Sequence, residues 1–309
     1  MEISMSKGAW LAAIVVCLWA APNGAARAQD AVGVERLTGT LGKIKKSNTV
    51  TIGFRDASVP FSYLNAARQP SGYSIDLCLA VVEQIKEDLG LENLAVKYLP
   101  VNPQTRISMV VDGAVDLECG QTTNNAERRK QVAFSPIVFV SGTKLLVKRT
   151  SKFKTYRDFA GRKVVVTEGT TNEAALKSLN DREKLGMTIV PVRENNEAFR
   201  AVGAGEADAW AGDDVVLFAS AAESKTPQDF KVLGEYLSYD PYGIMYRKDD
   251  RAFDALVKRT FVNMAESREL ARLYEQWFLR KLPSGKTLGI SMSPQLTSIF
   301  ETMGQSTTE

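Results

Sequence analysis

Two short segments of the chain place an arginine beside small polar residues, close to an apolar run that is typical of a β-strand. Arg55 follows the first run, and Arg128 ends the second segment, at 120–128. A third arginine, Arg106, lies between them in the sequence. A guanidinium group is planar and donates N–H bonds in a fixed geometry that fits a carboxylate. The three arginines therefore predict a binding site for a small acidic molecule.

The chain contains no histidine. This removes the usual general base at neutral pH and the commonest metal ligand, so Ser-His-Asp and Cys-His catalysis are excluded. Three cysteines are too few for a zinc site without histidine. Two short matches to enzyme motifs, at 151–154 and 285–287, lack the partner residues that these motifs require. We expect neither a metal nor a cofactor.

Length and composition indicate a globular protein with more than one lobe. The 309 residues exceed what a single hydrophobic core usually organises. Hydrophobic residues make up 44% and charged residues 24%, which is ordinary for a globular chain. The formal net charge of +3 is too small to indicate a nucleic-acid partner. We expect a monomer that does not bind nucleic acid.

The N-terminus has the pattern of an export signal. An apolar run at 8–21 is too short to span a bilayer comfortably, and the Ala-Arg-Ala sequence at 26–28 fits a cleavage pattern ahead of Gln29. Cys17 follows a valine rather than a small residue, which argues against a lipoprotein signal. We expect a signal peptide at 1–28, cleavage near Ala28–Gln29, and a periplasmic mature protein.

Export would leave two cysteines in a compartment that permits disulfides. Cys78 lies in a predicted helix, and Cys119 lies at the end of a predicted strand of the same lobe. The sequence leaves two interpretations open at this point: a disulfide between Cys78 and Cys119, or two buried free thiols.

Strands and helices are predicted to alternate in the same order in two stretches of the chain. The first stretch contains strands at 49–54, 94–99 and 115–119 and helices at 74–89 and 105–112. The second contains strands at 163–167, 188–192 and 207–211 and helices at 170–179 and 197–202. Alternation of this kind predicts an α/β fold of parallel strands with helices on both faces.

A short internal echo accompanies the repeated order of elements. The sequence Gly-Ala-Val-Asp at 113–116 and the sequence Gly-Glu-Ala-Asp at 205–208 hold equivalent places in the two stretches. The segments 138–147 and 239–246 are predicted to cross between two similarly built lobes, and the helices at 253–278 to return to the first lobe. A cleft between two lobes joined by two strands can close over a ligand.

These crossings set the predicted domain limits. Lobe 1 would comprise 29–140 and 241–309, and lobe 2 would comprise 141–240. The aromatic residues Phe61, Tyr63, Tyr73 and Trp210 fit either the wall of the cleft or the packed core, and the sequence does not decide between them.

Residues 72–77, Gly-Tyr-Ser-Ile-Asp-Leu, resemble the signature of the polar amino-acid solute-binding proteins of ABC importers, family 3. The segments 55–63, 118–125, 164–171 and 242–250 are similar to the periplasmic glutamate/aspartate binders of this family, in the same order and spacing. The resemblance covers nearly the whole mature chain. It implies a type II periplasmic-binding-protein fold, L-glutamate or L-aspartate as ligand, the membrane permease of an ABC importer as partner, and no enzymatic activity.

The resemblance also implies which residues hold the α-groups of the ligand. Arg128, Thr123 and Thr171 would hold the α-carboxylate, and Asp213 would receive the α-ammonium. Helix capping is the alternative role for Asp213 and for the two threonines, which lie at predicted helix starts.

The same resemblance assigns the ligand side-chain carboxylate to Arg55 and Arg106. Three neighbouring positions depart from the family pattern. Close relatives have serine where Pro103 and Gln121 stand, and histidine where Asn195 stands. Gln121 and Asn195 are kept as candidate ligand contacts, whereas proline has no N–H to donate. We expect the preference for an acidic ligand to survive, because two buried arginines without an anion would carry a large desolvation cost.

Two functions from other classes fit the same fold. One is a periplasmic enzyme similar to the dehydratases that resemble amino-acid-binding proteins, with Glu168, Glu194 or Asp213 as the acid or base. The other is a chemoreceptor-coupled sensor that binds the ligand but does not deliver it to an importer.

Overall fold

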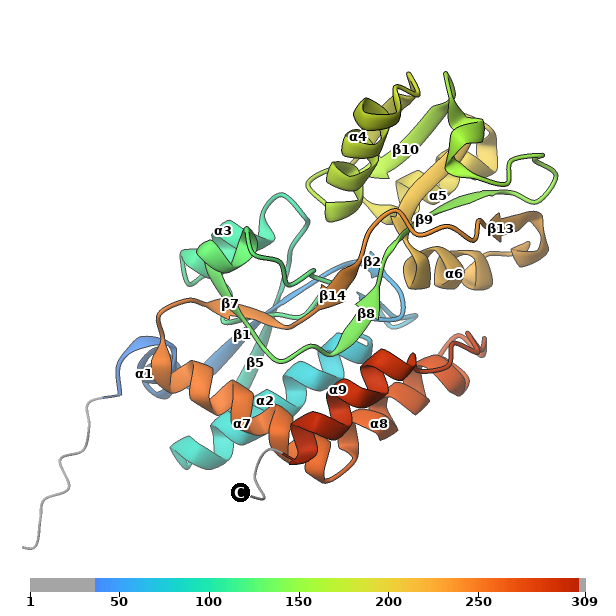
Figure 1. Cartoon of the computed structure of the whole chain (residues 1–309). Coiled ribbons are helices and arrows are strands. Elements are labelled where there is room, and N and C mark those ends of the chain that lie inside the picture. Colours follow the sequence, from blue (N-terminus) through green and yellow to red (C-terminus); the bar gives the residue numbers. More distant parts are fainter. Residues whose placement is uncertain (1–36, 306–309) are drawn as a thin grey trace, which may run out of the picture. The chain divides into compact units, whose positions relative to one another are not determined.

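A computed structural model describes residues 37–305 (Figure 1). The predicted signal peptide at 1–28 and its cleavage site lie outside these described residues. Within the described part of the chain, no helix combines the length and the apolar character that a membrane span needs.

The first five-stranded sheet has the strand order β5-β1-β6-β15-β7. Its strands are β1 (Thr49–Phe54), β5 (Ala95–Pro100), β6 (Leu117–Glu118), β7 (Val132–Phe134) and β15 (Met245–Arg247). β1 pairs in parallel with β5 and β6, whereas β15 runs antiparallel to β6 and β7. All but the first residue of β1 are buried, as expected of a strand covered on both faces. The helices α1 (Gly39–Ser47), α2 (Tyr73–Leu89) and α3 (Arg106–Val111) belong to this part of the chain.

The second five-stranded sheet has the order β11-β10-β12-β9-β13. Its strands are β9 (Thr143–Lys148), β10 (Lys163–Thr167), β11 (Thr188–Val192), β12 (Ala209–Asp213) and β13 (Phe230–Val232). β10 pairs in parallel with β11 and β12, and β9 runs antiparallel to β12 and β13. The helices α4 (Thr171–Glu183), α5 (Asn195–Ala204) and α6 (Asp214–Glu223) accompany this sheet. The predicted parallel pairing therefore holds for three strands of each sheet and not for the other two.

The internal echo has the same structural role in both sheets. The backbone N–H of Asp116 donates to the Thr51 carbonyl at 2.9 Å, and its Oδ2 accepts from the Thr51 N–H at 2.8 Å. Asp208 makes the same pair of bonds with Lys163, at 2.8 and 2.9 Å. An aspartate thus ties the turn after a helix to the central parallel strand in each case. This equivalence explains why four residues repeat and supports the prediction of two similarly built lobes.

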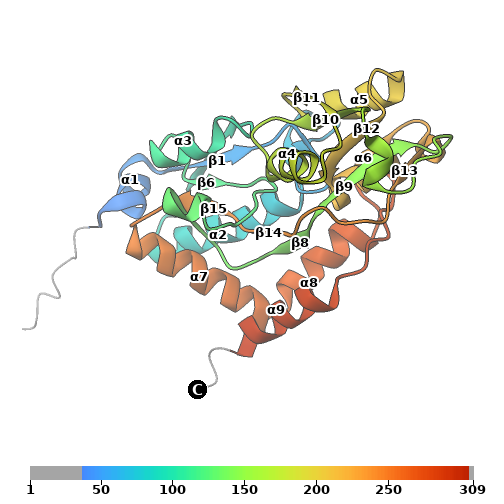
Figure 2. The ribbon, with the colours of Figure 1, turned by 45° about the horizontal axis from the view of Figure 1, so that its top comes forward.

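Two strands connect the sheets. β8 (Phe139–Ser141) and β14 (Asp240–Tyr242) pair antiparallel, β8 leads into β9 of the second sheet, and β14 leads into β15 of the first (Figure 2). Both strands lie in segments that the sequence predicted to cross between lobes. The exact limits of the lobes, 29–140, 141–240 and 241–309, stay a prediction.

The C-terminal part of the chain is helical. It contains α7 (Arg251–Glu266), α8 (Glu269–Tyr274), a π-helical turn η4 (Glu275–Leu279) and α9 (Pro294–Gln305). The region expected to be helical at 253–278 is interrupted at Arg268, whose φ of 60° lies in the left-handed region. α7 and α8 pack against α2 of the first lobe, and α9 packs against α7 (Figures 1 and 2).

The remaining elements are short. They are the strands β2 (Ala57–Ser58), β3 (Ser62–Leu64) and β4 (Pro70–Ser71) of a small antiparallel sheet, and the 3₁₀ turns η1 (Arg128–Lys130), η2 (Tyr156–Phe159) and η3 (Pro227–Asp229).

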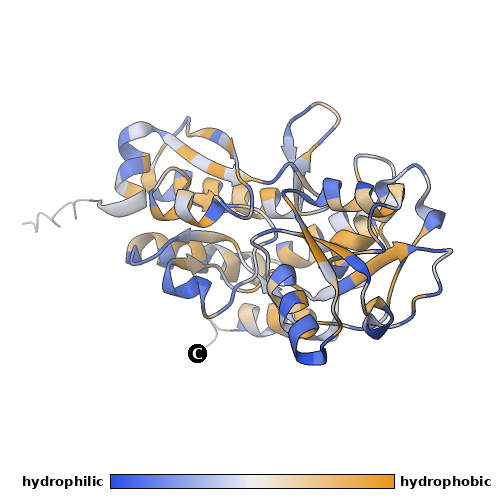
Figure 3. Ribbon diagram, turned by 90° about the horizontal axis from the view of Figure 1, so that it is seen from above, coloured by the Kyte–Doolittle hydropathy of each residue, from blue (hydrophilic) through white to orange (hydrophobic). Residues whose placement is uncertain are grey.

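The structure resolves the two interpretations of the aromatic residues. Phe61, Tyr73 and Trp210 are buried core side chains, exposed by at most 1%. Phe61 contacts Tyr73 and Phe139 edge to face. Tyr63 is only half-buried. The strands of both sheets carry the apolar residues that make these cores, as the hydropathy colouring shows (Figure 3).

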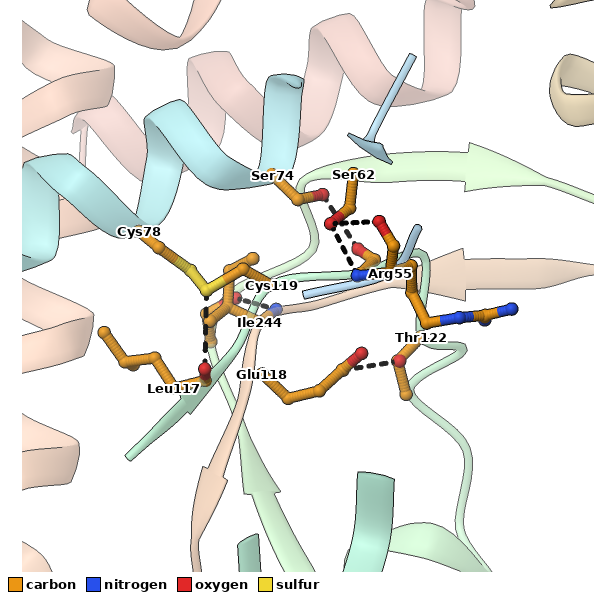
Figure 4. Close-up of a disulfide and its surroundings, with 11 residues drawn as sticks. Arg55, Ser62, Ser74, Cys78, Leu117, Glu118, Cys119, Thr122 and Ile244 are labelled. Atoms are coloured by element: carbon orange, nitrogen blue, oxygen red, sulfur yellow. Dashed lines mark hydrogen bonds between the residues drawn. A yellow bond between two sulfur atoms is a disulfide. The ribbon is translucent and has the colours of Figure 1, made fainter. Parts of the chain in front are cut away.

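Cys78 and Cys119 form a disulfide, with 6.3 Å between their Cα atoms (Figure 4). The bond joins α2 to the residue that follows β6, so the free-thiol interpretation is wrong. Figure 4 shows that Arg55 and Glu118 lie in the surroundings of this disulfide. The disulfide therefore fixes the helix to the strand end from which buried polar side chains extend.

Replacing both cysteines with serine should lower the free energy of unfolding by about 4 kcal/mol, because the bond closes a loop with a sequence separation of 41 residues. Urea denaturation of the variant and of the oxidised protein, with the protein kept in reducing agent as a control, measures the loss. Equal stability of the variant and the oxidised protein would contradict this expectation.

Candidate ligand-binding site

The three arginines predicted to bind an acidic ligand lie at the ends of elements of the first sheet and its helices. Arg55 directly follows β1, Arg106 is the first residue of α3, and Arg128 is the first residue of η1. Their exposed fractions are 1%, 2% and 8%. An isolated arginine is normally exposed, so burial of all three indicates a specific role.

Arg55 contacts a carboxylate from the second lobe. Its Nη2 donates to Glu194 Oε2 at 2.6 Å, and its backbone N–H donates to Ser62 Oγ at 2.9 Å. Its Nε has no hydrogen-bond partner among the described residues. Glu194 directly precedes α5, and its side chain is 23% exposed. The ion pair therefore bridges the two lobes and leaves part of the guanidinium free.

Arg106 reaches a second carboxylate through a threonine. Its Nη1 donates to Thr122 Oγ1 at 2.6 Å. Thr122 Oγ1 in turn donates to Glu118 Oε2 at 2.6 Å, as Figure 4 shows. Thr122 and Glu118 are fully buried. Burial and the neighbouring charge of Arg128 lower the pKa of Arg106 to about 9, although Glu118 acts in the opposite direction.

Arg128 and two threonines form the next part of the site. Arg128 Nη1 donates to the Thr123 carbonyl at 3.0 Å, and the hydroxyl groups of Thr123 and Thr171 lie 3.0 Å apart. Thr123 Oγ1 also donates to Asp240 Oδ1 at 3.2 Å. Burial lowers the pKa of Arg128. These contacts bring together three side chains that were predicted to hold an α-carboxylate.

The predicted helix start is correct for Thr171 and wrong for Thr123. Thr171 is the first residue of α4, and Thr170 supplies the capping oxygen by accepting the Glu173 N–H. Thr123 instead forms an isolated β-bridge with Tyr242. The chain there is held extended by the crossing strand, which a local capping pattern does not reveal.

Asp213 ends β12 and occupies the N-cap position of α6, but its side chain makes no capping hydrogen bond, so the predicted capping role is wrong. Asn172 Nδ2 donates to Asp213 Oδ1 at 3.0 Å and to Thr143 Oγ1 at 2.8 Å. Burial and the nearby carboxylate of Asp240 raise the pKa of Asp213 to about 7. The raised pKa means that the cations near Asp213 do not offset the cost of burying its ionised form.

The positions that depart from the family pattern lie beside the cluster. Asn195, the first residue of α5, accepts from Thr167 Oγ1 at 2.8 Å and donates to Ser58 Oγ at 3.4 Å. Gln121 is 8% exposed, and its Oε1 has no partner among the described residues. Pro103 is buried and lies against Gly169 of the second lobe.

Glu168 lies apart from these buried groups. It is exposed, and its carboxylate is 3.4 Å from Gln104 Nε2. Of the three acid or base candidates for an enzyme, only Glu194 and Asp213 therefore adjoin the arginines, and Glu194 is engaged by Arg55.

Sequence reasoning did not single out several residues of this cluster. These are Glu118, Thr122, Asn172 and Asp240. Glu118, Thr122 and Asn172 each lie within three residues of a predicted ligand contact, and Asp240 lies in a predicted crossing segment. Proximity in sequence was therefore the one available signal for their place in the site. Their roles depend on hydrogen bonds between distant segments.

The arrangement suits a small zwitterion. Burial lowers the pKa values of Arg106 and Arg128 and raises the pKa of Asp213, so the charged groups already present do not offset the cost of burying these charges. A molecule that carries both a carboxylate and an ammonium group would supply a further anion and a further cation. Among the described residues, no group of three or more acidic or cysteine side chains could hold a metal ion.

Comparison with known proteins shows which family this arrangement matches. The family model of bacterial extracellular solute-binding proteins, family 3, matches residues 50–280. The chain is 43% identical over 290 residues to an L-glutamate/L-aspartate-binding protein of Pseudomonas aeruginosa, covering 93% of each chain. It is 37% identical over 279 residues to the glutamate/aspartate import solute-binding protein of Escherichia coli, covering 90% of this chain and 92% of that protein.

Solved structures agree with the fold. An ancestral arginine-binding protein bound to glutamine has a TM-score of 0.67 and 27% identity, over 75% of this chain and 99% of that one. An ancestral amino-acid-binding protein, a precursor of cyclohexadienyl dehydratase, has a TM-score of 0.66 and 28% identity, over 78% of this chain and 99% of that one. The curated relatives of higher identity are binding proteins, so they favour neither the enzyme nor the sensor interpretation.

Proposed function

Because the chain belongs to the bacterial extracellular solute-binding proteins of family 3, we propose that it captures L-glutamate or L-aspartate and delivers it to the membrane permease of an ABC importer. The observation that carries this proposal is the burial of three guanidinium groups next to an acidic residue whose pKa is raised to about 7. Burying such charges is costly, and an acidic amino acid, with its carboxylates and its ammonium group, would offset part of that cost.

The α-groups would bind where the two lobes meet. Arg128, Thr123 and Thr171 are placed to hold the α-carboxylate, because the two hydroxyl groups are already 3.0 Å apart and Arg128 is bonded to the Thr123 carbonyl. Asp213 would receive the ammonium group, and Asn172 orients the Asp213 carboxylate. The threonines come from different lobes, so closure would assemble this half of the site.

The side-chain carboxylate of the ligand would bind Arg55 and Arg106. The Nε atoms of both have no partner among the described residues, so each guanidinium retains a free donor. Gln121 and Asn195 are proposed as neighbouring contacts. Pro103 removes the side-chain donor that related proteins have at its position, which leaves more of the recognition to the arginines.

Delivery would depend on closure of the lobes around the ligand. Three contacts of site residues already join the lobes: Arg55 with Glu194, Thr123 with Thr171, and Ser58 with Asn195. A ligand that contacts both lobes in the closed state shifts the population toward it by its differential affinity. The importer would then recognise the closed form.

The family is extracellular by its description, and we propose the periplasm as the location. Export would use the predicted signal peptide at 1–28, with cleavage near Ala28–Gln29. An oxidising compartment agrees with the disulfide between Cys78 and Cys119. We expect the mature protein to act as a monomer.

The proposal is tested by the thermal stability of protein that has been unfolded and refolded to remove carried-over ligand. L-Glutamate or L-aspartate at a thousand times its Kd should add about 4 kcal/mol to the free energy of unfolding. For a protein of this size the midpoint should rise by about 8 to 16 °C. Glutarate and succinate, which lack the amine, serve as controls and should give a much smaller shift. A flat response to both acidic amino acids would refute the proposal.

A further inference from the structure

Both arginines proposed to meet the ligand side chain already contact or approach a carboxylate of the protein. Arg55 donates directly to Glu194 at 2.6 Å. Arg106 is connected to Glu118 through the Thr122 hydroxyl, by two hydrogen bonds of 2.6 Å. Arg55, Arg106 and Glu118 are each exposed by no more than 2%. The two positive charges at this end of the site are therefore matched by two negative charges without any ligand.

From this charge balance we propose that the site also binds the amides of the acidic amino acids, L-glutamine and L-asparagine, with Kd values within about 100-fold of those of the acids. The inference rests on the proposed function, because it keeps the same contacts for the α-carboxylate and the α-ammonium group. It concerns only the end of the site that holds the ligand side chain.

The ion pair of Arg55 and Glu194 offers both kinds of partner that a carboxamide needs. A carboxamide accepts hydrogen bonds at its oxygen and donates two from its nitrogen. Arg55 retains an unpartnered N–H donor at Nε, which can bond the amide oxygen. The Glu194 carboxylate, at 2.6 Å from Nη2 of the same guanidinium, can accept from the amide nitrogen. A ligand carboxylate would instead face the like charge of Glu194.

Two unpartnered acceptors, one of them close to Arg55, point the same way. Gln121 Oε1 and Glu118 Oε1 are buried and have no hydrogen-bond partner among the residues that the structure describes. Gly120, between them in sequence, lies against the Arg55 side chain: a Cβ added there would be 3.1 Å from Arg55 Cγ and 2.4 Å from Glu118 Oε1. A ligand carboxylate has no proton to give to such acceptors. The NH₂ group of a carboxamide does.

Arg128 is a further charged group that acts on Arg106. The lowered pKa of Arg106 arises from burial and then from Arg128, the arginine proposed to hold the α-carboxylate. The α-carboxylate, which acids and amides share, is therefore placed to offset the repulsion between these two arginines. The remaining difference between acid and amide is decided at Arg55 and Glu194.

Calorimetric titration of ligand-free protein with L-glutamate, L-glutamine, L-aspartate and L-asparagine tests the inference. A site with unpaired buried charges rejects the wrong isostere by about 10⁴-fold or more. Here the Kd of each amide should lie within about 100-fold of the Kd of its acid. A larger ratio overturns the inference and leaves the proposed function standing. If none of the four ligands binds, the proposed function itself fails.

The variant Glu194→Gln tests whether Glu194 sets the ratio between the affinities for amides and for acids. It removes the negative charge beside Arg55, so acids should bind about tenfold more tightly and amides less tightly, and the ratio of the two should widen at least about tenfold. Glu197→Gln is the matched control, because it makes the same charge change on the first turn of α5. Glu197 Oε2 accepts from the Arg193 N–H at 3.3 Å, away from Arg55. An equal change of the ratio in both variants, or none in Glu194→Gln, would overturn the assignment.

Discussion

Replacing Asp213 with asparagine should weaken the binding of L-glutamate by at least about 100-fold, because the variant removes the charge proposed to receive the ammonium group. Removing one member of a buried, hydrogen-bonded charge pair generally costs about 2 to 5 kcal/mol or more of binding free energy. The asparagine side chain keeps an oxygen that can accept from Asn172, so the local packing should survive. Calorimetry of the variant at pH 8, where the native carboxyl group is ionised, measures the effect.

The same residue should make binding depend on pH. The pKa of Asp213 is raised to about 7 in the ligand-free protein, and the ammonium group requires the ionised form. Ligand binding should therefore release a proton below pH 7, and affinity should fall by about fifty-fold between pH 7 and pH 5. Titrations in two buffers with different ionisation enthalpies count the protons. Asp213→Asn should show a flat profile, and a flat profile in the native protein would contradict the proposed role.

Raising the pH should strengthen ligand binding through Asp213 but should lower the stability of the ligand-free protein. A carboxyl group whose pKa is raised by folding holds a proton in the native state that the unfolded chain releases between about pH 4 and pH 7. The free energy of unfolding should therefore fall as pH rises through this window, by up to about 4 kcal/mol from this group. Asp213→Asn should consequently be more stable than the native protein at pH 8 and nearly equal to it at pH 4, in the absence of ligand.

Much of the fold was predictable because its signals are local. The strands at 49–54, 163–167 and 188–192 agree with the structure residue for residue, since runs of β-branched residues mark them. The Thr170 cap and the Gly90 stop set helix boundaries through contacts with neighbouring residues. The short strand β6 was predicted too long, because its length is set by pairing with β1 and β15 rather than by its own sequence.

The site was predictable in its cations and less so in its anions. Buried arginines stood out by type and position, and Asp213 was expected on one side of the ligand. Glu194 was not expected to neutralise Arg55, because the two residues are 139 positions apart in the sequence. Glu118 was not expected to neutralise Arg106, because the contact runs through a third residue, Thr122. The expectation that the distal arginines need a ligand anion depended on their being unpaired, and the structure pairs both. Pairing of this kind is decided by tertiary packing, which the spacing of residues does not encode.

Replacing Arg106 with methionine should reduce the affinity for L-glutamate by about 100-fold or more and, in the same protein, raise the stability of the ligand-free state. The affinity falls because a buried donor to the ligand is lost. Stability rises because folding lowers the pKa of Arg106 to about 9, so its positive charge costs free energy in the native state at pH 7. Most of that gain is offset because Thr122 loses its donor and Glu118 loses a nearby cation, which leaves an increase of up to about 2 kcal/mol.

Urea denaturation without ligand and calorimetry with ligand measure the two effects of Arg106→Met separately. Arg129→Met is the matched control, because Arg129 is exposed, one residue from Arg128, and donates to Asn124 Oδ1 at 2.7 Å. That variant removes the same charge and should change neither quantity. A structural ion pair would behave differently: Arg106→Met would lose stability and keep its affinity. Opposite changes in stability and affinity arise only if the charge is held in an unfavourable environment for the sake of a ligand.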